Sequence, residues 1–383
     1  MIYFLWVTSI VLLAILTLFK ISSKIYLCIL ILIMSIYAYL FDPIIAWEYS
    51  GGAGMDGVRY YEILDTFRAW GWDDKTYIGA PGSGMLLYFY SFFPNNHFMQ
   101  LINFVLYMVI VLGVVYKIGT DFCLPDKYIV VGIFFCFIFT GFVAIINSIR
   151  YPMAIALFIF VLYLDVFRKY LWSRFMYLIP IFMHPGSIML VMVRFMSSAN
   201  IVHSCLGVIL IVYFWDTLGN NILDMAVNIV SVFFPNVGVL VSLANKTTAY
   251  TSHVVFDVGT TVRLMIIIVS SVMFMISSYV LQKKIELAGM QCRLLYNMGI
   301  LIPILSMLGL YMIEDSNISA RLISSGFSGF YFSFVYLYLV KAYQNCTEKI
   351  KKLDYVYWSF SFCWLLVHVV KINYDLLYFA FPW

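Results

Sequence analysis

The sequence predicts an all-α polytopic membrane protein, with about 11–12 transmembrane helices and additional re-entrant or interfacial helices. Of the 383 residues, 64% are apolar and only 11% are charged, and the mean hydropathy is +0.95. Soluble domains have about 45–50% apolar and about 25% charged residues. Apolar stretches long enough to cross the hydrocarbon recur along the chain, so we expect one membrane domain over residues 1–383.

The predicted spans follow these apolar stretches in chain order. The first stretch has neither a basic leader nor a small-residue cleavage site, so we expect a span there and not a removable signal. The complete set lies near residues 2–19, 25–41, 98–118, 128–148, 151–167, 171–184, 187–199, 201–215, 261–281, 294–313, 321–341 and 354–371.

Three apolar segments do not suit ordinary spans. Residues 84–93 are too few to cross a bilayer, and so is each of two helices expected to meet at His184-Pro185-Gly186. Broken helices at membrane depth are tolerated where they are buried in protein or line a wet cavity, so these breaks predict an outward-facing cavity. The third segment, Ile222 to Leu243, is interrupted by polar residues and proline, and we expect it to lie along the interface as a lid.

The distribution of charge predicts the orientation. The loops on one side hold 15 of the 23 cations, which makes that side cytoplasmic. Both termini then lie outside, together with two long outer (periplasmic) loops, residues 42–81 and 216–260. Five of the eight remaining cations are arginines, namely Arg59, Arg68, Arg150, Arg263 and Arg321. Arginine binds phosphate oxygens with two parallel hydrogen bonds, so orientation alone does not account for this preference.

Arg150, Arg263 and Arg321 are each expected where a span begins on the outer face. A cation there opposes the helix dipole, and outward loops normally contain few Lys and Arg. A guanidinium beside the free N–H groups of a helix start suits a diphosphate. The alternative is that each arginine extends to lipid headgroups or pairs with a carboxylate such as Glu314 or Asp315.

The first outer loop places an acid, a base and aromatic rings together in Asp56-Gly-Val-Arg59-Tyr60-Tyr61-Glu62. The preceding glycines spell G-x-G-x-x-G, but no predicted strand precedes them, which excludes a dinucleotide fingerprint. Tyr60, Tyr61, Trp70 and Trp72 are candidates for stacking on sugars. The alternative is an aromatic belt at the membrane interface.

His184 is the histidine nearest a helix break, where it is able to bind a phosphate or accept a proton from a hydroxyl. The alternative is a structural histidine with satisfied hydrogen bonds. The seven cysteines show no C-x-x-C spacing, and we predict neither a metal site nor a cofactor.

Four short motifs resemble the Wzy-type O-antigen and polysaccharide polymerases, and in particular their EpsG-like branch. They are G-M-D-G-V-R-Y-Y in the first outer loop, I-R-Y-P-M-A at Arg150, H-x-x-S at His184 and A-R-L-I at Arg321. The resemblance implies a fold similar to the C-type glycosyltransferases in a bacterial inner membrane, with the active site facing the periplasm. It also implies transfer of a growing glycan from undecaprenyl diphosphate to the next lipid-linked repeat unit, and a chain-length regulator membrane protein as a partner.

The residues suggest how such a transfer would proceed. Arg150, Arg263 and Arg321, with Arg59 as a fourth, would bind the diphosphates of donor and acceptor without a metal. Asp56 or Glu62 would act as the base for the acceptor hydroxyl, with His184 as a second choice. The alternatives are an O-antigen ligase-like enzyme, a single-sugar transferase with a lipid monophosphate donor, a transporter or flippase of lipid-linked glycans, and a scaffold of an export complex.

Overall fold

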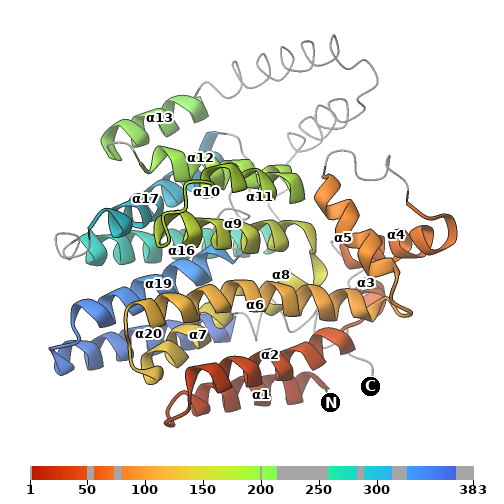
Figure 1. The fold of residues 1–383 in the computed structure, drawn as a ribbon, viewed down its shortest axis with the longest axis horizontal. Helices are drawn as coiled ribbons and strands as arrows, with labels where there is room; N and C mark the ends of the chain where they lie inside the picture. The colour runs from red at the N-terminus through yellow and green to blue at the C-terminus, as the bar shows by residue number, and fades with distance from the viewer. Residues whose placement is uncertain are drawn as a thin grey trace. The chain divides into compact units, whose positions relative to one another are not determined.

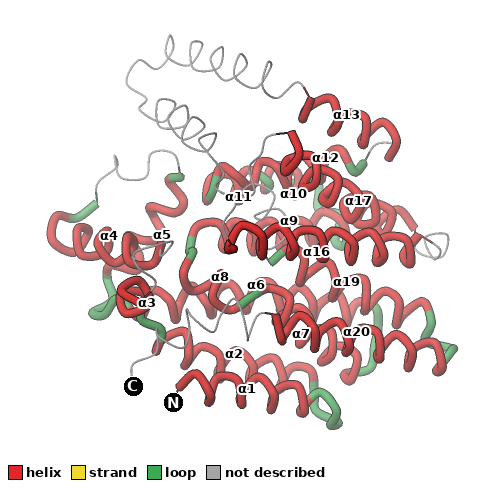
Figure 2. Tube along the Cα trace, turned by 180° about the vertical axis from the view of Figure 1, so that it is seen from behind, coloured by secondary structure: helices red, strands yellow, loops and turns green. Residues whose placement is uncertain are grey.

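The computed structural model describes residues 2–49, 56–72, 80–198, 201–213, 258–282, 289–312 and 326–367. The described residues are all-helical and include no strand, which confirms the predicted fold class at that level (Figures 1 and 2). The chain divides into two compact units. Unit 1 holds Met1–Asp73, Gly82–Met183 and Gly326–Trp383, and unit 2 holds Asp74–Pro81 and His184–Ser325. The expectation of a single membrane domain over the whole chain stays a prediction.

Unit 1 is a helical bundle organised around one long helix, α6, His97–Asp121. Helix α6 packs against α2, α7 and α9, and it lies between α2 and α9 in both ribbon views (Figures 1 and 2). The other helices of this unit are α1 Ile2–Leu16, α2 Ser23–Leu40, α3 Pro43–Tyr49, α4 Asp56–Trp70, α5 Pro81–Ser91, α7 Asp126–Thr140, α8 Phe142–Asn147, α9 Arg150–Val166, α10 Ser173–Met176, α11 Leu178–Met183, α19 Phe327–Ala342 and α20 Thr347–Val367.

Within the core of unit 1, helices α7 and α19 pack against each other at close backbone distance. A Cβ atom on Gly329 would lie 2.6 Å from the carbonyl oxygen of Cys136, so only glycine allows the two backbones to approach this closely. Ser333 Oγ donates a hydrogen bond of 2.7 Å to the carbonyl of Gly132 across the same contact. Every residue of α19 from Phe327 to Val340 is buried, which is the pattern of a helix surrounded by other helices.

Several predicted spans agree closely with helices of the structure. Helices α2, α6 and α9 begin and end within three residues of the predicted spans 25–41, 98–118 and 151–167. The predicted span 128–148 is wrong as a single helix, because it is divided into α7 and α8 at Gly141. Gly141 has φ +79° and ψ 111°, a conformation that interrupts the helix and that glycine adopts without strain.

Unit 2 contains one single-turn and four longer helices among its described residues: η1 Pro185–Ser187, α12 Ile188–Met196, α13 Ile201–Tyr213, α16 Val258–Gln282 and α17 Gly289–Met312. Helix α17 packs against α12, α13 and α16. Asn297 on α17 donates a buried hydrogen bond of 2.8 Å to the carbonyl of Ser197, just after α12. The predicted lid at residues 222–243 lies outside the described residues, as does nearly all of the outer loop 216–260.

Two of the described helices, α2 and α6, are long and apolar enough to cross a membrane by length and composition. The described part of the first outer loop, 42–81, is largely helical, since it contains α3 and α4. Helix α4 is the element that brings the predicted loop residues to the rest of unit 1.

Candidate functional site

The candidate site in unit 1 lies where the chain breaks between α8 and α9. Ser148 has an extended backbone with φ −121° and ψ 104°, and α9 begins at Arg150. The predicted helix start at Arg150 is therefore confirmed. The N-cap position falls on Ile149, directly before Arg150. Pro152 lies in the first turn of α9, where its missing N–H leaves no hydrogen bond unmade.

The amino-terminal end of α4 lies directly against this break. The backbone N–H of Gly57 donates to Asn147 Oδ1 at 3.1 Å, and Ser148 Oγ lies 3.5 Å from Asp56 Oδ2. A Cβ atom on Gly57 would lie 2.7 Å from the Cβ of Pro43, so glycine is needed for this close approach. The Asp56-Gly57 part of the sequence motif is thus explained by packing of α4 on the α8–α9 break.

Arg150 and Tyr60 form the central contact of the site. Arg150 Nε donates a hydrogen bond of 3.1 Å to Tyr60 Oη, and the guanidinium carbon lies 5.9 Å from the centre of the tyrosine ring. Tyr60 is only 1% exposed, whereas Arg150 is partly exposed. The buried ring holds the guanidinium at the first residue of α9, with cation–π attraction added to the hydrogen bond.

Three charged side chains act on the Tyr60 hydroxyl. Burial raises the pKa of Tyr60, Arg150 lowers it, Asp56 raises it and Arg59 lowers it further. The net direction is upward, so the hydroxyl stays neutral and the formal charge of Arg150 is not neutralised by it. Two cations and one carboxylate therefore act on the Tyr60 hydroxyl. Arg59 is exposed and Asp56 is partly exposed.

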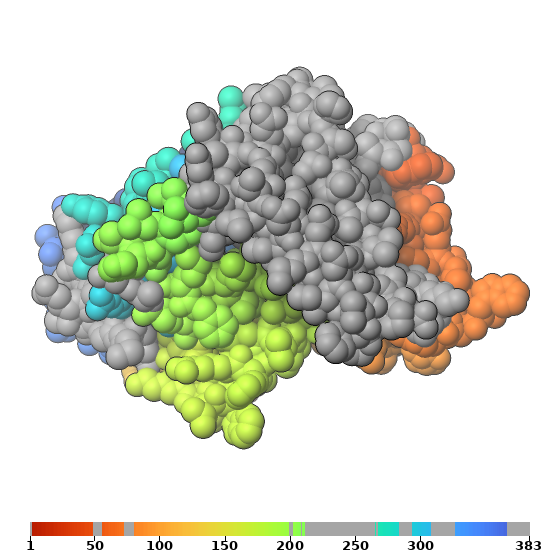
Figure 3. All heavy atoms as spheres, turned by 90° about the horizontal axis from the view of Figure 1, so that it is seen from above, coloured from red at the N-terminus to blue at the C-terminus, as the bar shows by residue number. Residues whose placement is uncertain are grey.

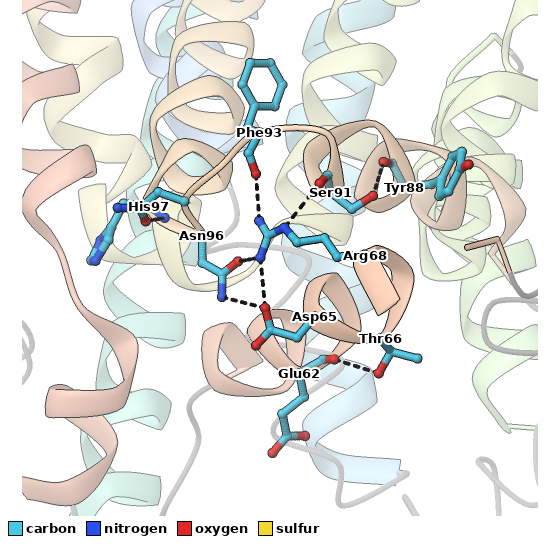
Figure 4. A network of polar contacts seen from close by, with 10 residues as sticks. Glu62, Asp65, Thr66, Arg68, Tyr88, Ser91, Phe93, Asn96 and His97 are labelled. Carbon is cyan, nitrogen blue, oxygen red and sulfur yellow. Dashed lines mark hydrogen bonds and ion pairs between the residues drawn. The ribbon is translucent and has the colours of Figure 1, made fainter. Parts of the chain in front are cut away.

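A second cluster holds the other end of α4 in place, and the sequence did not predict it (Figure 4). Arg68 Nη2 donates to the Phe93 carbonyl at 2.9 Å, Nε donates to the Ser91 carbonyl at 3.2 Å, and Nη1 contacts both Asp65 and Asn96. The ion pair of Arg68 with Asp65 measures 2.8 Å. Because these acceptors lie on α4 and on the α5–α6 turn, Arg68 joins the two.

Two of the four predicted glycan-binding aromatics are buried. Tyr60 is 1% and Tyr61 6% exposed, and the Tyr61 hydroxyl donates to Gln100 Oε1 at 3.0 Å. This corrects the expectation that their rings stack on sugars, because neither ring presents a face to a ligand. Trp70 is 86% and Trp72 41% exposed. The orange segment that holds α4 and α5 lies at the border of the space-filling view, where its tip stands out (Figure 3).

Of the remaining predicted site residues, Glu62 belongs to unit 1, His184 and Arg263 belong to unit 2, and Arg321 falls outside the described residues. Glu62 is exposed on α4 and points away from the Arg68 cluster (Figure 4). His184 lies at the predicted helix break, where its Nδ1 accepts a 3.0 Å hydrogen bond from the N–H of Gly186. Arg263 lies in the second turn of α16, one turn later than expected, because that helix begins at Val258. Arg321 lies outside the described residues.

The described residues include no group of three or more His, Cys, Asp or Glu arranged to hold a metal ion. No protein-family model, curated protein or solved structure matches the chain. A function for this chain must therefore be inferred from its residues and their geometry.

Proposed function

We propose that this chain is a multi-pass glycosyltransferase of the bacterial inner membrane, similar to the Wzy and EpsG-like polymerases. It would transfer the growing glycan from undecaprenyl diphosphate to the next undecaprenyl-diphosphate-linked repeat unit at the periplasmic face. The proposal includes the many-span topology, both outer termini and the two outer loops predicted from the sequence. Its main support is one observation: Arg150 is the first residue of α9 and bonds to the buried Tyr60, beside Asp56 and Arg59.

The chemistry needs charge stabilisation more than proton transfer at the leaving group. The lipid diphosphate leaves as a stable anion, so the protein must bind its developing charge and orient the attacking hydroxyl. The first N–H groups of α9 and the guanidinium of Arg150 together provide donors for phosphate oxygens. Arg59 provides a second cation near the same phenol. Arg263 and Arg321 stay sequence-based predictions as further diphosphate ligands.

Asp56 is the preferred base for the acceptor hydroxyl. It is partly exposed at the start of α4, it lies near Tyr60, and Ser148 orients its carboxylate. Glu62 is six residues further along α4 and is exposed, so we place it second. His184, the further choice from the sequence, uses Nδ1 as an acceptor within its own turn.

A transporter or flippase of lipid-linked glycans is the main alternative from another class, since broken helices and arginines also serve transport. An O-antigen ligase-like transferase is the alternative within the enzymes. A transferase is favoured over a transporter because Asp56, like Arg150 and Arg59, acts on the Tyr60 hydroxyl, and a carboxylate near an anion-binding group suits deprotonation of a hydroxyl better than passage of an anion.

The test uses purified full-length protein in detergent with intact lipid-linked repeat units. Detergent has no compartments, so transport cannot produce a signal. A ladder of longer glycans on the lipid is the expected result. If the glycan moves only to an unrelated acceptor, the ligase alternative replaces the polymerase. If a folded protein leaves the substrate unchanged, the transferase proposal is overturned and reconstituted vesicles then test for flipping.

A further inference from the structure

The chain that leaves α9 and enters α10 carries exposed aromatic and basic side chains next to one another. We define it as the aromatic turn, Lys169-Tyr170-Leu171-Trp172-Ser173-Arg174-Phe175. The exposed fractions are 59% for Tyr170, 81% for Leu171, 73% for Trp172 and 67% for Phe175. The yellow-green part of the chain, which holds α9 to α11, reaches the lower edge of the space-filling view, with side chains standing out from the surface (Figure 3).

The turn is held firmly, so its exposed side chains are not the result of a loose segment. Ser173 is fully buried and donates to the Tyr170 carbonyl at 2.6 Å. Tyr177, between α10 and α11, is 2% exposed and donates to Asp165 Oδ2 of α9 at 3.0 Å. The inner face of this stretch is therefore satisfied within the protein. The outer face presents large apolar groups that water would solvate poorly.

The carboxylates near the turn already have partners. Asp121 bonds to both Arg168 and Tyr163, and Asp165 accepts from Tyr177. Only two ion pairs occur in the described part of the chain, and neither includes Lys169 or Arg174, which are both exposed. Two cations thus remain on the surface of the turn, where they favour an anionic partner.

Lys169 gives an independent indication that its charge is used. Its φ is +54°, a left-handed conformation that usually belongs to glycine at the end of a helix. The N–H of Tyr170 bonds to the Leu164 carbonyl at 3.2 Å, which ties the turn back to the last part of α9. A lysine in this strained position suggests a function for its side chain, because glycine would make the same turn more easily.

The apolar surface continues from the turn along α11 and loses its charge on the way. Leu178 is 65%, Ile179 42% and Phe182 51% exposed, and α11 contains no charged residue. A surface that passes from cations and tryptophan to purely apolar side chains matches the change from headgroups to acyl chains in one leaflet. A soluble protein partner would not require this order.

We infer that the aromatic turn binds anionic phospholipid headgroups of the cytoplasmic leaflet through Lys169 and Arg174, with Trp172 and Phe175 at the level of the headgroups. The inference rests on the membrane location within the proposed function but not on glycan transfer. Phosphatidylglycerol is therefore expected to bind there in preference to phosphatidylcholine. Each cation near an anionic surface contributes about 1 kcal/mol, which corresponds to about fivefold in relative affinity.

The test uses the full-length protein in lipid nanodiscs that contain a small fixed fraction of brominated phosphatidylglycerol or brominated phosphatidylcholine. Bromine quenches nearby tryptophans, and the difference between the unmodified protein and Trp172→Phe isolates the signal of Trp172. We expect stronger quenching by phosphatidylglycerol. Lys169→Gly and Arg174→Gln should each lower the relative binding constant of phosphatidylglycerol about fivefold. Neither should lower the thermal unfolding midpoint, and Lys169→Gly also removes the strain of the left-handed lysine.

Cys123→Gly is the matched control. Cys123 is exposed and has φ +55°, so the substitution relieves the same kind of backbone strain without removing a charge. It should leave the relative binding constant unchanged. Three results would each overturn the inference. They are equal quenching of Trp172 by both lipids, no quenching of Trp172 by either lipid, and an unchanged relative binding constant of phosphatidylglycerol in Lys169→Gly. If the protein also forms the glycan ladder in detergent, any of these results would show that the lipid site is wrong while the proposed glycan transfer still stands.

Discussion

The two ends of α4 each meet an arginine, but under opposite electrostatic conditions. Arg68 lies in the last turn of α4, where the helix dipole favours a cation, and it bonds to a carboxylate, an amide oxygen and two backbone carbonyls. Arg150, which meets the first turn of α4, is the first residue of α9, where the dipole disfavours a cation, and its Nε donates to a neutral phenol. The comparison assigns Arg68 to the fold and supports the proposal that Arg150 binds a ligand.

The largest effect is expected at Arg150. Arg150→Ala should slow glycan extension about 10²–10³-fold, the usual loss when one donor to a developing anion is removed. The thermal unfolding midpoint should change little, because removing a cation from a helix start offsets part of the lost contact with Tyr60. The two measurements are ladder formation and unfolding of the same preparation. Lys20→Ala, at an exposed cation of a predicted inward loop, is the control. If Arg150→Ala extends the glycan as fast as the unmodified protein, the proposed difference in role between Arg150 and Arg68 is wrong.

Arg68→Ala should give the opposite result, with a loss of about 1–3 kcal/mol in unfolding free energy, because carbonyls and a carboxylate lose a charged donor. Arg68→Lys should recover only part of this, since an ammonium group cannot reproduce the planar fork. Thermal unfolding in detergent is the measurement. Arg59→Ala on the same helix is the control for stability and should change it by no more than about 0.5 kcal/mol. If the thermal unfolding midpoint of Arg68→Ala is unchanged, the Arg68 cluster has no structural role.

Tyr60→Phe tests whether the Tyr60 hydroxyl orients Arg150 for binding of a ligand. The substitution keeps the buried ring but removes the hydroxyl that orients Arg150, so binding of lipid diphosphate should weaken about tenfold, equal to about 1.4 kcal/mol. Isothermal titration with undecaprenyl diphosphate measures this. Tyr61→Phe is the matched control, because its hydroxyl bonds to Gln100 and not to an arginine. If both variants bind equally well, Tyr60 has only a packing role.

The same comparison shows what the sequence was able to predict. The helix start at Arg150 was visible because the apolar run of the predicted span 151–167 begins directly after it, which is a local feature of the chain. The Arg68 cluster was only half visible. Asp65 and Arg68 are spaced as neighbours on one helix face, but Asn96 and the Phe93 carbonyl come from a distant turn. The burial of Tyr60 and Tyr61 was hidden for the same reason, since it depends on α6 and on the α8–α9 break.

The smallest expected effect concerns alkaline pH. Burial raises the pKa of Tyr60 and of Tyr61 above the ordinary tyrosine value of 10.0. Above that pH the unfolded chain loses these protons while the native protein keeps them, so the unfolded state binds fewer protons and stability falls as pH rises. The loss is at most about 1.4 kcal/mol per pH unit for each tyrosine. Unfolding midpoints measured across this range should fall less steeply in Tyr60→Phe than in the unmodified protein. Parallel curves would mean that the Tyr60 hydroxyl titrates normally, and that the phenol beside Arg150 is more accessible to water than its burial indicates.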